Sequence, residues 1–159
     1  MADSTLKQLT HAMLDDLARQ AKQSPRQRAN HNLHQQLSEP VQRLAIAMEP
    51  DTFVRPHRHP QTWELLSALR GRFVVLLFDG EGVVTSRTVL GEESSVIEFP
   101  ANTWHAVLSL DSGGVIFEVK QGAYAPLTEA DYAPWCDSGP GQEARLNAWY
   151  AKAQVGDRL

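Results

Sequence analysis

Short runs rich in apolar residues fill the middle of the chain, from Val41 to Gln121. β-Branched and aromatic residues dominate these runs, and turn residues separate them, which is typical of β-strands. The expected strands are Val41–Met48, Thr52–Pro56, Trp63–Leu69, Phe73–Phe78, Val83–Leu90, Ser95–Phe99, His105–Ser109 and Val115–Gln121. No helical pattern interrupts them, so the sequence predicts an all-β barrel or sandwich and disfavours a parallel α/β sheet.

Helical patterns flank this region on both sides. Apolar residues recur at helical spacing over residues 5–22, where Ser4 is a candidate N-cap and Pro25 ends the helix. A short closing helix is expected over 142–153, after a tail rich in proline. We therefore expect one structural domain with three parts: an N-terminal helix and extended arm at 1–40, a β-barrel at 41–121, and an irregular tail with a short helix at 122–159.

Composition narrows the class of protein. The chain has 159 residues, a net charge of -4 and a single cysteine, Cys136. This charge gives no electrostatic case for a nucleic acid or a membrane surface as partner, and no apolar run approaches the roughly 20 residues of a membrane helix. The first residues do not resemble a secretory signal, and a lone cysteine suits a reducing compartment. We expect a cytoplasmic protein whose partner is a small molecule.

Three histidines and a glutamate have the spacing of a metal site. His57 and His59 alternate, so both can point to one face of an extended segment, and Glu64 follows after a turn. His105 would join them from a separate strand. Three imidazoles and a carboxylate suit one divalent transition metal ion, such as zinc, iron, nickel, copper or manganese. The alternative is a polar, hydrogen-bonded barrel mouth without metal. Protonated imidazole cannot ligate, so metal affinity should fall as the pH drops through about 6.5.

A second set of polar residues precedes the barrel and alternates with a period of two. In an extended segment these side chains would share one face. Its members are Arg26, Arg28, Asn30, Asn32 and His34. Such a face could bind a carboxylate or phosphate and sugar hydroxyls. Alternatively, the segment is a solvent-exposed arm. Arg55 is two residues before His57, so in an extended segment both side chains point to the same face. Arg55 then either faces the ligand or needs an acidic partner.

The metal-site motifs resemble those of the cupin superfamily. The run His57-x-His59-x-x-x-x-Glu64, followed by Gly71, resembles the first cupin motif, and Pro100-x-Asn102-x-x-His105 resembles the second. Asn102 replaces the usual glycine, but asparagine also adopts positive φ readily. The resemblance implies a double-stranded β-helix (jelly-roll) barrel and a metal held by His57, His59, Glu64 and His105.

Further segments are similar to the WbuC family of cupin metalloproteins. They are Ser24-Pro25-Arg26-x-Arg28-x-Asn30-x-Asn32-x-His34, Val41-Gln42-Arg43, Pro56-His57-Arg58-His59-Pro60-x-Thr62-Trp63-Glu64, Leu69-Arg70-Gly71, Phe78-Asp79 and Thr103-Trp104-His105. Members of that family occur in bacterial O-antigen and surface-polysaccharide gene clusters. The resemblance thus implies a pathway context, without a substrate. Cupin barrels often pair, which makes a homodimer one option.

Three kinds of function are compatible with a metal-binding cupin barrel. The first is a metal-dependent enzyme, an isomerase or an oxidoreductase such as a dioxygenase, that acts on a sugar-derived or carboxylate metabolite. Its proton carrier would be Glu64 or His34. The second is a binding or sensor module that holds a similar ligand unchanged. The third is a structural role, in which the metal only stabilises the barrel.

Overall fold

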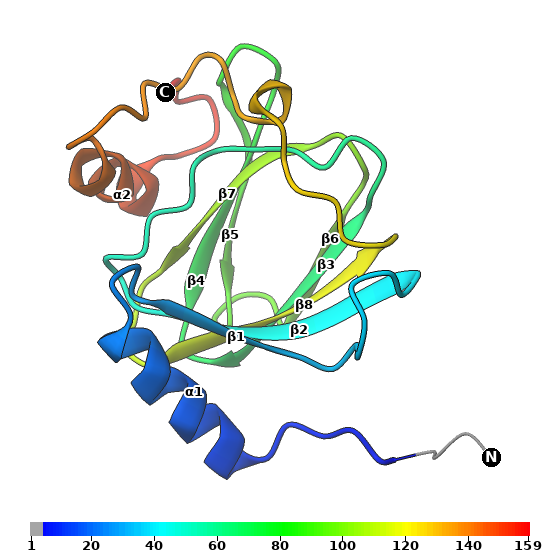
Figure 1. Ribbon diagram of the computed structural model, residues 1–159. Helices are drawn as coiled ribbons and strands as arrows, with labels where there is room; N and C mark the ends of the chain where they lie inside the picture. Colours follow the sequence, from blue (N-terminus) through cyan, green and yellow to red (C-terminus); the bar gives the residue numbers. More distant parts are fainter. Residues whose placement is uncertain (1–4) are drawn as a thin grey trace.

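A computed structural model describes residues 5–159 as two antiparallel β-sheets with one α-helix packed on each (Figure 1). The larger sheet has the order β1-β2-β8-β3-β6 and the smaller sheet the order β5-β4-β7. The strands are β1 Arg28–Asn32, β2 Val41–Met48, β3 Glu64–Arg70, β4 Phe73–Phe78, β5 Val84–Leu90, β6 Val96–Phe99, β7 Trp104–Ser109 and β8 Gly114–Gln121; the helices are α1 His11–Gln23 and α2 Glu143–Lys152, with a 3-10 turn at Glu129–Asp131.

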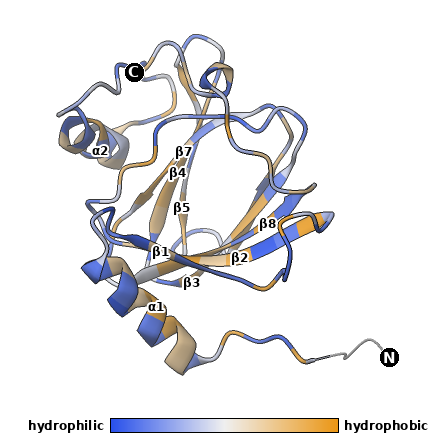
Figure 2. Cartoon of the chain, in the orientation of Figure 1, coloured by the Kyte–Doolittle hydropathy of each residue, from blue (hydrophilic) through white to orange (hydrophobic). Residues whose placement is uncertain are grey.

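The apolar core lies between the two sheets and continues on the outer face of the smaller one. Along β4, Phe73 and Val75 point into the space between the sheets, whereas Val74 and Leu76 pack on the opposite side, beneath α2. A strand that is covered on both faces must be apolar throughout. This explains why β4 is hydrophobic along its length in Figure 2, whereas the edge strand β1 is hydrophilic.

Helix α1 covers the outer face of the larger sheet. Its buried residues Leu14, Leu17 and Ala21 pack against Ala45 of β2 and Val115 of β8. Small residues on β2 allow the helix to approach the sheet closely. As a result, the opposite face of β2 and β8 is the one that points into the barrel.

Several boundaries differ from those that the sequence predicted. Helix α1 begins at His11, six residues later than expected, because the Thr10 side chain caps it by accepting a hydrogen bond from the Met13 N–H at 3.1 Å. Ser4, the predicted cap, lies outside the described residues. The expected strand at 52–56 is wrong: this segment is not part of either sheet. Its backbone joins a neighbouring strand only at His57, where it meets His105.

The closing helix is confirmed, and part of the predicted arm is a strand. Residues 28–32 form β1 and pair antiparallel with β2, Arg28 opposite Met48 and Asn32 opposite Leu44. Helix α2 lies within the predicted range and buries Leu146 and Tyr150 against the smaller sheet. Neither helix in residues 5–159 has the length and apolar character that a membrane crossing requires.

Candidate metal centre and ligand cavity

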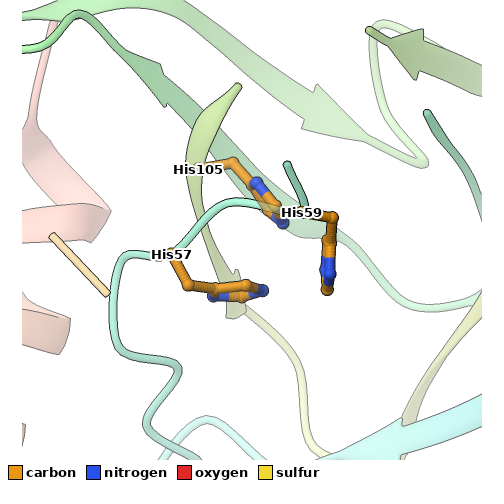
Figure 3. A group of neighbouring side chains, drawn as sticks. All are labelled: His57, His59 and His105. Atoms are coloured by element: carbon orange, nitrogen blue, oxygen red, sulfur yellow. The ribbon is translucent and has the colours of Figure 1, made fainter. Parts of the chain in front are cut away.

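The three predicted histidines meet at one end of the barrel. His57 and His59 lie on the loop before β3, and His105 is the second residue of β7. Each ring offers one nitrogen, and these three nitrogens all lie within 4.8 Å of one another. Figure 3 shows the rings turned toward a common point. The ring centroids of His57 and His105 are 4.3 Å apart.

Backbone hydrogen bonds hold this arrangement. The His57 N–H donates to the His105 carbonyl at 3.1 Å, and the His105 N–H donates back to the His57 carbonyl at 2.9 Å. The Nδ1 atoms of both rings lie 2.8 Å from carbonyl oxygens, those of Arg55 and Thr103. A carbonyl only accepts, so each Nδ1 carries the proton and each Nε2 keeps a free lone pair. This is the usual outer-shell support of a metal-binding histidine.

The turn that resembles the second cupin motif positions His59. Asn102 has a φ of 65°, as its replacement of glycine predicted. In this conformation its N–H donates to the His59 carbonyl at 2.8 Å. The turn at 100–102 therefore ties the two motifs together, although they are more than 30 residues apart in the sequence.

Glu64 completes the cluster from the first position of β3. Its side chain is almost fully buried, and its Oε2 lies 3.1 Å from His105 Nε2 and 3.6 Å from His59 Nε2. Among the described residues, this Oε2 atom has no hydrogen-bond partner. Because His105 Nδ1 carries the proton, a carboxylate oxygen and a nitrogen lone pair face each other. Two ligands about 2.1 Å from one ion and at right angles to each other are about 3 Å apart, so a metal ion fits between these atoms.

Burial keeps the histidine rings neutral. It lowers the pKa of His57 to about 3, with the nearby His105 adding to the effect, and lowers the pKa of His105 to about 4. Burial and the positive charge of Lys120 lower the pKa of His59 to about 3. A neutral imidazole is the form that ligates a metal, so at neutral pH no proton has to leave these rings before an ion binds.

A cavity of about 520 Å³ opens above the cluster. Its walls are the inner face of the larger sheet, the loop that carries His57 and His59, and the tail around Tyr124 and Tyr132. This volume is in the range of small-molecule sites. The metal-ligand atoms lie in its wall, so a ligand in the cavity can reach an ion held there.

Two charged residues of the cavity were not predicted from the sequence. Glu118 and Lys120 of β8 line the cavity, and Lys120 Nζ lies 3.9 Å from Glu118 Oε2. Burial raises the pKa of Glu118 to about 8, and the charge of the adjacent Glu64 and a hydrogen bond to it contribute to this shift. Glu118 and Lys120 lie on the same side of β8 as Ile116, which belongs to the core between the sheets. Strand alternation therefore predicts that both side chains point into the barrel. Their polarity suggested the opposite, because polar residues on a half-covered strand usually face solvent.

The structure divides the predicted ligand-binding residues into two groups. Arg26, Arg28 and Arg55 line the cavity. Asn30 and Asn32 are exposed, and the Asn30 amide donates to Asn32 Oδ1 at 2.9 Å. The arm therefore does not present one continuous face to the cavity. It reaches the cavity only at its N-terminal end.

His34, a predicted proton carrier, is buried away from the cavity lining. It is 4% exposed, and its Nδ1 accepts a hydrogen bond from the Arg43 N–H at 2.9 Å. This contact fastens the end of the arm to β2.

Arg55 has the acidic partner that its position required. Its Nη2 donates to Glu129 Oε1 at 2.9 Å, and its guanidinium carbon lies 4.4 Å from the centroid of the Tyr132 ring. Since Glu129 is exposed, this pair is weak in itself. Together with the stacking on Tyr132, it fixes the tail beside the histidines.

Solved structures show which fold this is. The protein TT1209 from Thermus thermophilus is 21% identical, with a TM-score of 0.53 over 74% of this chain and 96% of that one. Oxalate oxidase, in complex with the substrate analogue glycolate, is 16% identical, with a TM-score of 0.51 over 65% of this chain. The chain matches only 55% of the oxalate oxidase chain. At these identities the comparison shows the fold alone, which is the cupin barrel.

No curated protein matches the chain. One family does, over residues 9–90, and its description is "Domain of unknown function (DUF6016)". The match covers just over half of the chain, from the N-terminal helix to the end of β5. It includes both histidines of the first motif and Glu64. This cupin-fold chain with a three-histidine cluster therefore belongs to the DUF6016 family.

Proposed function

We propose that this protein is a metal-dependent cupin enzyme that acts on a small carboxylate or sugar-derived metabolite. One observation carries the proposal: the buried Glu64 Oε2 has no partner among the described residues, yet faces the lone pair of His105 Nε2 at 3.1 Å. A metal ion or a proton between the two atoms would relieve their repulsion, and burial disfavours the protonated ring. The cavity directly above gives a small molecule access to a metal ion there.

His57, His59, His105 and Glu64 would hold the ion. A divalent transition metal bound there would polarise a carbonyl or hydroxyl oxygen of the substrate, or activate dioxygen. With these four residues as ligands, coordination positions would stay open for substrate, water or dioxygen. The donor set suits zinc, iron, nickel or manganese.

Residues of the chain would bind the substrate and move its proton. Glu64 lines the cavity and His34 does not, so we assign proton transfer to Glu64, with Glu118 beside it. A raised pKa, as at Glu118, suits a group that must both release and accept a proton near neutral pH. Arg26 and Arg28 would orient an anionic group of the substrate.

The test has two stages. The protein, purified without an affinity metal, is first analysed for bound metals, and about one equivalent of a transition metal is expected. It is then incubated with keto acids, hydroxy acids and nucleotide sugars, with each candidate metal loaded in turn. Metal-dependent product formation would support the enzyme. Binding without turnover would identify a binding module instead, and a protein that takes up no metal would refute the proposal.

We also propose the pathway in which the protein acts. Its support is the similarity of residues 24–120 to the WbuC family, which implies a cytoplasmic protein of surface-polysaccharide metabolism. Deleting the gene should then alter the O-antigen pattern of the cell. A homodimer is part of the same proposal, because β1 is an edge strand of the larger sheet and can pair with a second copy. Light scattering of the purified protein tests it.

A further inference from the structure

The polar side chains that line the cavity are of an unusual kind. Apart from the histidines and two tyrosines, the described residues of the lining contribute only charged or apolar side chains. Asparagine, glutamine, serine, threonine and aspartate are absent from this part of the described chain. A sugar carries many neutral hydroxyls, and each needs a hydrogen-bond partner when it leaves water. Apart from the two tyrosine hydroxyls, the described lining offers no neutral side-chain hydroxyl or amide to pair with them.

The charges of the lining are mainly positive. Four cationic side chains of the described residues line the cavity: Arg26, Arg28, Arg55 and Lys120. Two carboxyl groups oppose them, and one of these, Glu64, faces the histidines. A metal ion would add further positive charge. The cavity as a whole therefore favours an anion.

Two of the four cations are already paired within the protein. Arg55 pairs with Glu129 at 2.9 Å, and Lys120 Nζ lies 3.9 Å from Glu118 Oε2. The guanidinium groups of Arg26 and Arg28 make neither a salt bridge nor a hydrogen bond to any described residue. Burial lowers the pKa of the Arg28 guanidinium and Arg26 adds to this effect, while the carboxyl groups of Glu118 and Glu64 partly oppose it, so the charge is still held at a cost in solvation. A bound anion would offset that cost with charge-assisted, bidentate hydrogen bonds.

The rest of the wall is apolar. Apolar side chains of β2, β3, β7 and β8 belong both to the lining and to one core cluster: Ile46, Met48, Leu66, Val107 and Ile116. Such a surface gains free energy by covering apolar area, at about 25 cal/mol per Å². It has no hydrogen bond to offer a hydroxyl group.

We propose that the ligand of this cavity is a small organic anion with an apolar body, and that Arg28, assisted by Arg26, binds its anionic group. The inference rests on the proposed function only in that an oxygen of the same ligand reaches the metal. It selects an organic anion with an apolar body over a sugar. The anionic group is a carboxylate or a phosphate, since a guanidinium binds both in a bidentate manner.

Calorimetry on the zinc-loaded full-length protein tests this assignment. The probes are phenylpyruvate, its methyl ester, phenyl phosphate, glucuronate and glucose. We expect phenylpyruvate or phenyl phosphate to bind at least about tenfold more tightly than the uncharged ester and both sugars, because a hydrogen bond to a charged group contributes about 1.5–3 kcal/mol. The better of the two anions identifies the anionic group.

Variants then locate the anion site. Arg28→Met should weaken binding of the preferred anion at least about tenfold, and Arg28→Lys should restore part of it. Arg26→Met, at a more exposed position, should have a smaller effect in the same direction. Arg19→Met is the matched control, because Arg19 lies on the exposed face of α1 and should leave the dissociation constant unchanged. Thermal melting of each variant without ligand checks that it is folded.

The outcomes separate this inference from the proposed function. Zinc content is measured on the same samples. If zinc binds but glucose or glucuronate is preferred, or if Arg28→Met binds the anion as well as the parent protein, the inference is overturned and the metal site stands. Zinc-loaded protein that binds none of the probes also overturns it. Failure to bind zinc at all would refute the proposed function instead.

Discussion

Replacing Glu64 by glutamine should change metal affinity and metal-free stability in opposite directions. Glu64 Oε2 faces the lone pair of His105 Nε2 at 3.1 Å and has no partner among the described residues. A glutamine amide at this place can donate a hydrogen bond to Nε2. The variant therefore gains one neutral hydrogen bond in the buried site and loses a repulsive contact.

The gain can be estimated from that one contact. A neutral buried hydrogen bond contributes about 1 kcal/mol to the free energy of unfolding. For a domain of this size, that corresponds to a rise in Tm of about 2–4 °C. Metal binding should move the other way, because the amide supplies no negative charge. Removing even an outer-shell partner of a ligand lowers metal affinity about 10- to 100-fold, so losing a ligand should cost at least that much.

Two assays are needed. Urea unfolding in the presence of a chelator measures metal-free stability, and competition with a chromophoric chelator measures zinc affinity. Glu98→Gln is the matched control, since Glu98 is an exposed residue of β6 and should change neither quantity. The reasoning fails if Glu64→Gln is less stable than the parent protein without metal, or if it binds zinc with unchanged affinity.

Four more predictions concern the end of the barrel that carries the three histidines. His59→Ala should lose most of the bound metal by elemental analysis, whereas His31→Ala, at an exposed position, should keep it; full retention in His59→Ala would remove His59 from the ligand set. Metal binding should persist well below pH 6.5 and disappear only toward about pH 4, because burial lowers the pKa of His105 to about 4. A zinc titration in which half of the bound zinc is lost near pH 6.5 would contradict this. Without metal, stability should fall as the pH drops below about 6.5, because the unfolded chain takes up protons on rings that stay neutral in the fold; equal urea midpoints at pH 7.5 and 5.5 would argue against it. Asn102→Val should lower the free energy of unfolding by about 1–2 kcal/mol, whereas Asn102→Gly should be tolerated, because φ is 65° at this position; a valine variant as stable as the glycine variant would be inconsistent with strain there.

The pH prediction shows how the structure changes a sequence-based expectation. From the sequence alone, histidine ligands should release the metal near the ordinary pKa of imidazole, about 6.5. Burial of His57 and His105 disfavours their charged forms, so the expected loss moves to lower pH. Residue identity sets the reference pKa, but burial sets the shift, and burial is a property of the fold.

The sequence by itself predicted most of the strands and the side chains of the candidate metal site. The spacing of His57 and His59 and the turn before His105 could be recognised in the sequence, because residue spacing and turn preference are local properties. The cupin resemblance supplied the barrel that joins these segments. Glu64 was correctly placed beside the histidines for the same reason, although its role as a ligand remains a prediction.

Only the tertiary structure decided which face of each strand points into the cavity. Alternation shows that Glu118 and Lys120 share a face with Ile116, but it does not say whether that face is inside. Helix α1 covers the other face of β8 at Val115, and this long-range contact turns the two charges inward. The same applies to the arm, where Arg28 reaches the cavity and Asn32 does not, because β1 lies at the edge of the sheet. Which face is covered depends on segments distant in the sequence, so local patterns cannot determine it.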